Sequence, residues 1–97
     1  MGQEAKAIAS YDAALATDPD YVPALFNKAI LVEADDLPEA VEMYREVVEI
    51  DDQHAAAFMR TGFGLLHLGQ AADGEAALEK GLQLDPSMAQ VEAPSHD

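Results

Sequence analysis

The sequence feature that most constrains the fold is a helical pattern that occurs three times at a nearly constant interval. The three copies end at Pro19, Asp52 and Pro86, which are 33 and 34 residues apart. Other positions align in the same register: Ala7 with Ala40 and Gly74, Ile8 with Val41 and Glu75, Tyr11 with Tyr44 and Leu78, and Leu15 with Val48 and Leu82. A period of this length predicts a stack of like units, each of which covers part of the next.

A second helical pattern lies between the copies, and it also aligns with itself. It pairs Leu25, Phe26, Ala29, Ile30 and Val32 with Phe58, Met59, Gly62, Phe63 and Leu65. The unit is therefore two short helices and a turn. Small residues such as Ala29 and Ala40 let two antiparallel helices approach closely, and larger ones such as Tyr44 fill the layer between units.

The period and its columns resemble those of the tetratricopeptide repeat family. The shared features are a small residue on the first helix (Ala29, Gly62), a small residue opening the second helix, an aromatic residue or leucine one turn later, and a terminal Asp-Pro pair. The stretches "GQEAKAIASYDAALATDP" and "LGQAADGEAALEKGLQLDP" match this pattern closely, and the resemblance covers roughly residues 2–88. It implies an all-α fold, namely an α-solenoid of antiparallel helix pairs. About two and a half repeats, with five helices, would wind into a right-handed superhelix.

The alignment divides the chain into one repeat domain, over residues 1–88, and a flexible C-terminal tail, over residues 89–97. Within the domain we expect the second helix of a first repeat at 2–19 and full repeats at 20–53 and 54–87. The five helices are predicted at about 3–17, 21–34, 38–51, 54–68 and 71–84. Asp36 should cap the third helix and Asp52 the fourth, and Gly69 should end the fourth.

Both ends of this stack are expected to be imperfectly covered. The first repeat lacks its first helix, and no closing helix follows Leu84. A longer array, a partner or the chain itself could supply the cover, and Met88 and Val91 could fold back on Leu78 and Leu82. Self-coverage is the simplest of these solutions, because it needs no second molecule.

The charge of the chain limits its partners. It has 19 acidic and 5 basic residues, for a formal net charge of −14. Such a surface repels phosphate backbones and anionic lipid, so nucleic acid is excluded as a partner, and basic protein segments are favoured. There is no long apolar run, which predicts no membrane insertion by this segment and a cytoplasmic protein, although a signal or anchor could precede it.

The sequence contains no recognisable motif for catalysis or cofactor binding. The chain has no cysteine, which excludes disulfides and thiolate metal sites. The glycines of "GFGLLHLG" lie within a helical pattern and follow no strand, so they do not form a phosphate loop. The terminal "SHD" cannot hold the fixed geometry of a triad, and the acidic pairs at the turns are too few for calcium. We therefore expect no cofactor, no metal and no enzymatic activity.

The family resemblance also implies where a partner would bind. In this family the first helix of each pair lines a concave groove that holds partner segments. The corresponding residues here are Phe26, Asn27, Ile30, Glu33, Met59, Arg60, Phe63, Leu66 and His67. Most of these side chains are apolar, and only Asn27 and Arg60 could contribute to binding a terminal carboxylate. An amphipathic helix or an apolar extended segment is therefore the better ligand.

These observations predict a protein-interaction module that binds a peptide or helix of another protein in an apolar groove. A stripe at helical spacing can equally be core, in which case Phe26 and Phe63 would pack on each other. A further alternative is self-association, as a homodimer, through the uncovered terminal helices. The chain could also be a fragment of a longer repeat scaffold.

Overall fold

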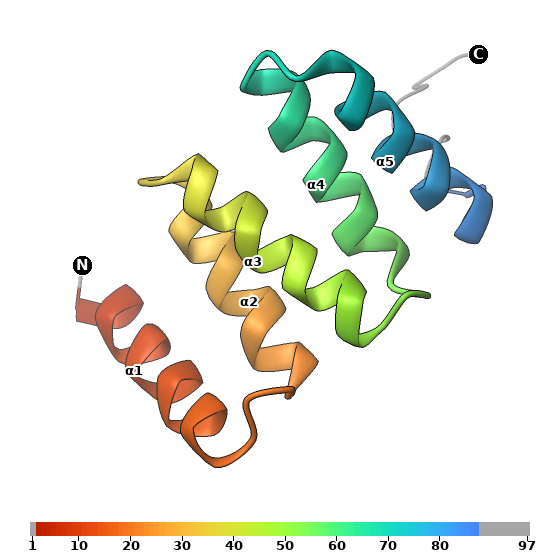
Figure 1. Ribbon diagram of the computed structural model, residues 1–97. Coiled ribbons are helices and arrows are strands. Elements are labelled where there is room, and N and C mark those ends of the chain that lie inside the picture. The colour runs from red at the N-terminus through yellow and green to blue at the C-terminus, as the bar shows by residue number, and fades with distance from the viewer. Residues whose placement is uncertain (1, 88–97) are drawn as a thin grey trace, which may run out of the picture.

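The computed structural model describes residues 2–87, which form five α-helices joined by short turns. They are α1 (Gly2–Thr17), α2 (Val22–Glu33), α3 (Leu37–Ile50), α4 (Ala55–His67) and α5 (Ala71–Leu84). Each helix packs against the helices that precede and follow it in the chain, so that α1 and α5 lie at opposite ends of the stack (Figure 1). The described residues contain no strand. The predicted all-α solenoid of paired helices is confirmed.

The start of α3 has the predicted cap, whereas the start of α4 does not. Asp36 accepts a hydrogen bond from the backbone N–H of Glu39, at 3.2 Å. At α4 the prediction of Asp52 as the cap is wrong, because His54 Nδ1 accepts the bond from the Ala57 N–H, at 3.1 Å. The acidic residues before it shape the turn instead, since the Asp51 carboxylate accepts from the Gln53 N–H at 3.1 Å. That turn delays the helix until Ala55.

Gly69 ends α4 as predicted. Its φ of 85° lies in the left-handed region, where a β-carbon would be strained. The Gly69 N–H bonds to the Leu66 carbonyl at 3.0 Å, and the Gln70 N–H bonds to the Leu65 carbonyl at 2.8 Å. These two bonds are those of a Schellman motif, which satisfies the last carbonyls of the helix and reverses the chain toward α5.

The main core lies where α2, α3 and α4 meet. Its buried members are Leu25, Ala29, Ala40, Met43, Tyr44, Val47 and Ala57. Ala29 and Ala40 have no exposed surface, in keeping with their predicted role of letting α2 and α3 approach closely. Tyr44 and Val47 are the largest side chains that are fully buried.

Glycines take the place of these alanines between α4 and α5. A methyl group at Gly62 would lie 2.8 Å from the carbonyl oxygen of Gly74, and one at Gly74 would lie 2.9 Å from the carbonyl oxygen of Gly62. Both distances are shorter than a β-carbon tolerates. The two backbones therefore meet at a separation that only glycine permits.

The two terminal helices are poorly covered within the described residues, as expected. No residue of α1 is buried, and the buried residues of α5 are the two glycines Gly74 and Gly81. The predicted tail over 89–97, and the predicted contacts of Met88 and Val91, lie outside the described residues.

Candidate partner-binding surface

Three of the predicted groove residues line a hollow between the ends of α2 and α4. Glu33, Phe63 and His67 contribute to it, together with Asp35 and Leu37 from the turn and the start of α3. The space measures about 500 Å³ and is open to solvent on one side. We call it the α2–α4 hollow.

Phe63 is the main apolar group of the hollow. Its side chain is 44% exposed, although it is one of the largest apolar residues in the chain. The next residue, Gly64, is buried against α3, where a methyl group would lie 2.6 Å from Val41 Cγ2. Because successive side chains of a helix point about 100° apart, this contact turns Phe63 away from α3 and toward the hollow.

Glu33 is held at the edge of the hollow by two other helices. Tyr44 of α3 donates its hydroxyl to Glu33 Oε1 at 2.6 Å, and Arg60 Nη1 of α4 lies 3.3 Å from the same oxygen. This cluster, the Glu33–Tyr44–Arg60 cluster, joins α2, α3 and α4. It fixes the Glu33 carboxylate in place and engages Arg60, one of the two residues considered for carboxylate binding.

The cluster should make stability depend on pH in the alkaline range. Burial raises the pKa of Tyr44 above its ordinary value, and its hydrogen bond to the Glu33 carboxylate adds to the rise. Below about pH 10 the tyrosine is protonated in both the folded and the unfolded chain, so the pKa difference has no effect there. Above about pH 10 the unfolded chain loses this proton while the folded chain keeps it, and the free energy of unfolding falls as pH rises.

Urea unfolding at about pH 9 and about pH 11 measures this dependence. The Tyr44→Phe variant, which has no phenol to ionise at this position, is expected to lose less stability between the two values than the wild type. An equal loss in the two proteins would show that Tyr44 does not cause the alkaline sensitivity.

The predicted groove residues Phe26 and Ile30 pack mainly against the core. The Phe26 ring lies 4.6 Å from the His54 ring and 5.7 Å from the Tyr44 ring, measured between centroids. Both residues are half-buried and pack against the main core, whereas Asn27 beside them is exposed. The aromatic contacts of Phe26 are therefore with His54 and Tyr44.

Met59, one of the predicted groove residues, is buried against α5. Its side chain is 8% exposed and packs against α5, where a methyl group at Gly81 would lie 2.7 Å from its sulfur. Leu66 also contacts α5, since a methyl group at Gly74 would lie 2.9 Å from its Cγ, but it remains 37% exposed. The side of α4 that carries both residues therefore faces α5. The absent side chain of Gly81 leaves room that the flexible Met59 fills.

Charged groups around the hollow are mostly acidic. Glu33 and Asp35 are on its wall with His67. Elsewhere, Lys28 of α2 pairs with Asp12 of α1 at 2.6 Å. This ion pair joins α1 and α2.

The part of the chain that the structure describes has neither a metal-binding cluster nor a membrane-spanning helix. Within residues 2–87, no three His, Cys, Asp or Glu side chains are grouped so that they could hold a metal ion. No helix in this range has both the length and the apolar character that a membrane span requires.

Comparison with known proteins gives a likeness of fold. No protein-family model matches the chain, and no curated protein matches it. Among solved structures, a crystal structure of MamA matches with a TM-score of 0.80 and 18% identity, over 91% of this chain and 52% of the MamA chain. A second MamA crystal structure matches with a TM-score of 0.75 and 18% identity, over 97% of this chain and 52% of the other.

The chain thus spans about half the length of the MamA chains that it matches. Residues throughout α1–α5 take part in the match, because it covers nine-tenths of the chain or more. This protein therefore shares the helical stack of MamA, in agreement with the α-solenoid of antiparallel helix pairs that its repeats indicate.

Proposed function

We propose that this protein is a non-catalytic interaction module that binds a segment of another protein at the α2–α4 hollow. The observation that carries the proposal is the exposure of Phe63 in a concave site. A large aromatic side chain that is 44% exposed loses contact with water when an apolar partner group covers it. Aromatic residues in such pockets are common anchors of protein interfaces.

The charges at the hollow indicate the composition of the partner segment. Glu33 already pairs with Arg60, so Asp35 is the acidic residue of the hollow that favours a lysine or arginine close to the apolar group that covers Phe63. A cation there could also lie over the ring of Phe63. The net charge of −14 would attract basic segments from a distance, at low salt above all. A short helix or extended segment with one apolar anchor and one neighbouring basic residue fits these requirements.

Binding of labelled peptides of this composition tests the proposal. A set of peptides that pair Leu, Ile or Phe with Lys or Arg would be screened by fluorescence anisotropy, with charge-reversed peptides as negative probes. Phe63→Ala is expected to weaken binding of the best peptide at least about tenfold, or roughly 1.4 kcal/mol. Asp35→Asn should weaken it less, and that loss should disappear at high salt.

Ile50→Ala is the matched control. Ile50 is 41% exposed on α3 and does not line the hollow, so its truncation should leave peptide affinity unchanged. Far-UV circular dichroism would establish that each variant retains its helices. Equal affinity of the wild type and the Phe63→Ala variant for every peptide would refute binding at this hollow.

A further inference from the structure

Helices α1, α3 and α5 are the second helices of their repeats, and their residues align. On α1 and α3, one face packs against the helix that follows in the chain, and we call the aligned face of α5 its outer face. Leu78 and Leu82 occupy the positions of Tyr44 and Val48 on α3. The second helices α1 and α3 are followed by α2 and α4, which pack on them. On α5, the corresponding face is a shallow depression of about 400 Å³ lined by Glu75, Leu78, Glu79, Leu82 and Gln83. We call it the α5 seat.

The faces of α1 and α3 are covered by α2 and α4, which we call the incoming helices. The contacts at these two faces show which aligned positions meet. On α1, Asp12 pairs with Lys28 of α2. On α3, Val41 lies against Gly64 of α4. In the repeat alignment Lys28 corresponds to Thr61, which precedes Gly64 by three residues. Each filled face thus shows one position of the incoming helix in contact with its seat, and the two positions lie three residues apart in the repeat register.

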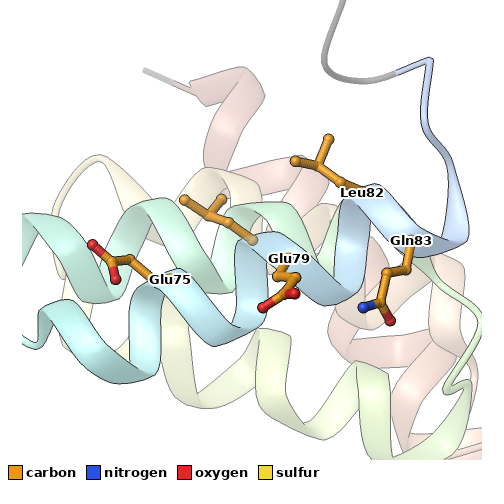
Figure 2. A pocket seen from close by; sticks show the side chains of 5 residues that line it. Glu75, Glu79, Leu82 and Gln83 are labelled. Atoms are coloured by element: carbon orange, nitrogen blue, oxygen red, sulfur yellow. The ribbon is translucent and has the colours of Figure 1, made fainter.

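On α5 both of the facing positions are glutamates. Glu79 stands where α1 has Asp12, and Glu75 stands where α3 has Val41. Glu75 and Glu79 are exposed, and Leu78 and Leu82 are half-buried. Figure 2 shows Glu79 and Gln83 on one side of the α5 axis and Leu82 on the other. The seat thus combines an apolar strip with two carboxylates one helical turn apart.

We propose that the α5 seat binds an amphipathic helix of another protein, one that carries two basic residues at i and i+3 beside its apolar strip. The first would pair with Glu79, as Lys28 pairs with Asp12, and the second would pair with Glu75. The apolar strip would cover Leu78 and Leu82. This site is separate from the α2–α4 hollow, and the proposal does not depend on the function proposed there.

Charge argues against two possible occupants of the seat, residues 88–97 and a second copy of this chain. Residues 88–97 contain neither lysine nor arginine, so they cannot neutralise Glu75 and Glu79. A second copy brings another net charge of −14, and two of its five basic residues, Lys28 and Arg60, already pair with Asp12 and Glu33. A helix from a basic partner meets neither obstacle.

The probe for this seat can be taken from the chain. Residues 21–34 comprise α2 and its two capping residues, and α2 fills the equivalent seat on α1. A synthetic peptide of this sequence with Leu31→Lys presents two lysines three apart, and a hydrocarbon staple on its opposite side would hold it helical, since short isolated helices are marginal in water. Its binding to the whole 97-residue protein would be measured by fluorescence anisotropy.

Glu75→Gln/Glu79→Gln is expected to weaken binding of this peptide at least tenfold. The control Glu42→Gln/Glu46→Gln makes the same charge change at the same spacing on α3, where both residues are exposed, and should alter affinity less than threefold. Glu75→Lys/Glu79→Lys should bind a peptide whose two lysines are replaced by glutamate better than it binds the original. Phe63→Ala should not affect this peptide, which separates the seat from the hollow.

Three results would overturn the proposal. The first is equal affinity in the two glutamine variants. The second is a dimer, seen by light scattering, that competes with the peptide and that Glu75→Lys/Glu79→Lys disrupts. The third is a gain in affinity of more than tenfold when residues 88–97 are removed, which would show that the tail occupies the seat.

Discussion

Replacing Tyr44 with alanine is expected to lower the free energy of unfolding by about 3–5 kcal/mol. Tyr44 has no exposed surface, and its removal would leave a cavity in the core between α2, α3 and α4. It would also remove the hydroxyl that donates to Glu33 at 2.6 Å and the ring that Phe26 contacts. A chain of this size has a total stability of roughly 5–15 kcal/mol, so the loss would remove at least about a fifth of that stability.

Urea unfolding followed by circular dichroism measures this loss, with two variants as references. Tyr21→Ala truncates a tyrosine that is 47% exposed and makes no side-chain capping bond, so it should cost no more than about 0.5 kcal/mol. Tyr44→Phe keeps the ring and loses the hydroxyl, and it should cost about 1 kcal/mol. Similar losses for Tyr44→Ala and Tyr21→Ala would contradict the position of Tyr44 in the core.

The second large effect is expected at the contact of α4 with α5. Gly62→Val should destabilise the protein by about 3 kcal/mol, because its β-carbon would lie 2.8 Å from the backbone oxygen of Gly74 and 2.5 Å from Leu78 Cγ. In an open helix, replacing glycine would instead stabilise by a few tenths of a kcal/mol or more, since glycine has the greater conformational entropy to lose. The collision with backbone is the larger effect, because the Gly74 oxygen cannot turn away without moving α5.

Gly2→Val is the control for this prediction. Gly2 lies at the start of α1 with no other group within 4 Å of the place where its β-carbon would be, and the same substitution there should change stability by less than about 0.5 kcal/mol. Thermal unfolding of both variants would separate propensity from packing. A Gly62→Val protein as stable as the wild type would mean that α4 and α5 do not approach so closely.

The helices could be predicted from the sequence because their signals are local. Apolar residues at helical spacing, the capping carboxylate of Asp36 and the left-handed Gly69 each act within a few residues, and the predicted ends agree with the observed ones to within one or two residues. The cap of α4 was misplaced because Asp52 and His54 are both polar and lie two residues apart. Which of the two caps α4 depends on the turn at Asp51, and the spacing of apolar residues does not predict that turn.

The candidate site was less predictable because it depends on which side of a helix meets which neighbour. Helix α4 is apolar on more than one side, and its periodicity does not say that Met59 faces Gly81 while Phe63 faces solvent. The Glu33–Tyr44–Arg60 cluster joins residues separated by 11 and 27 positions, so it exists only once three helices are assembled. The acidic character of the surface, in contrast, follows directly from composition.

The packing of each helix on its chain neighbours has a mechanical consequence. In such a linear array, a pull applied to the two ends passes through every junction in series, and the weakest one yields first. That junction is expected to be the one between α1 and α2, since α1 contributes no buried residue to it. Under load, α1 would then detach first from the rest of the protein. The close alanine contacts between α2 and α3 and the glycine contacts between α4 and α5 would keep the remaining helices together.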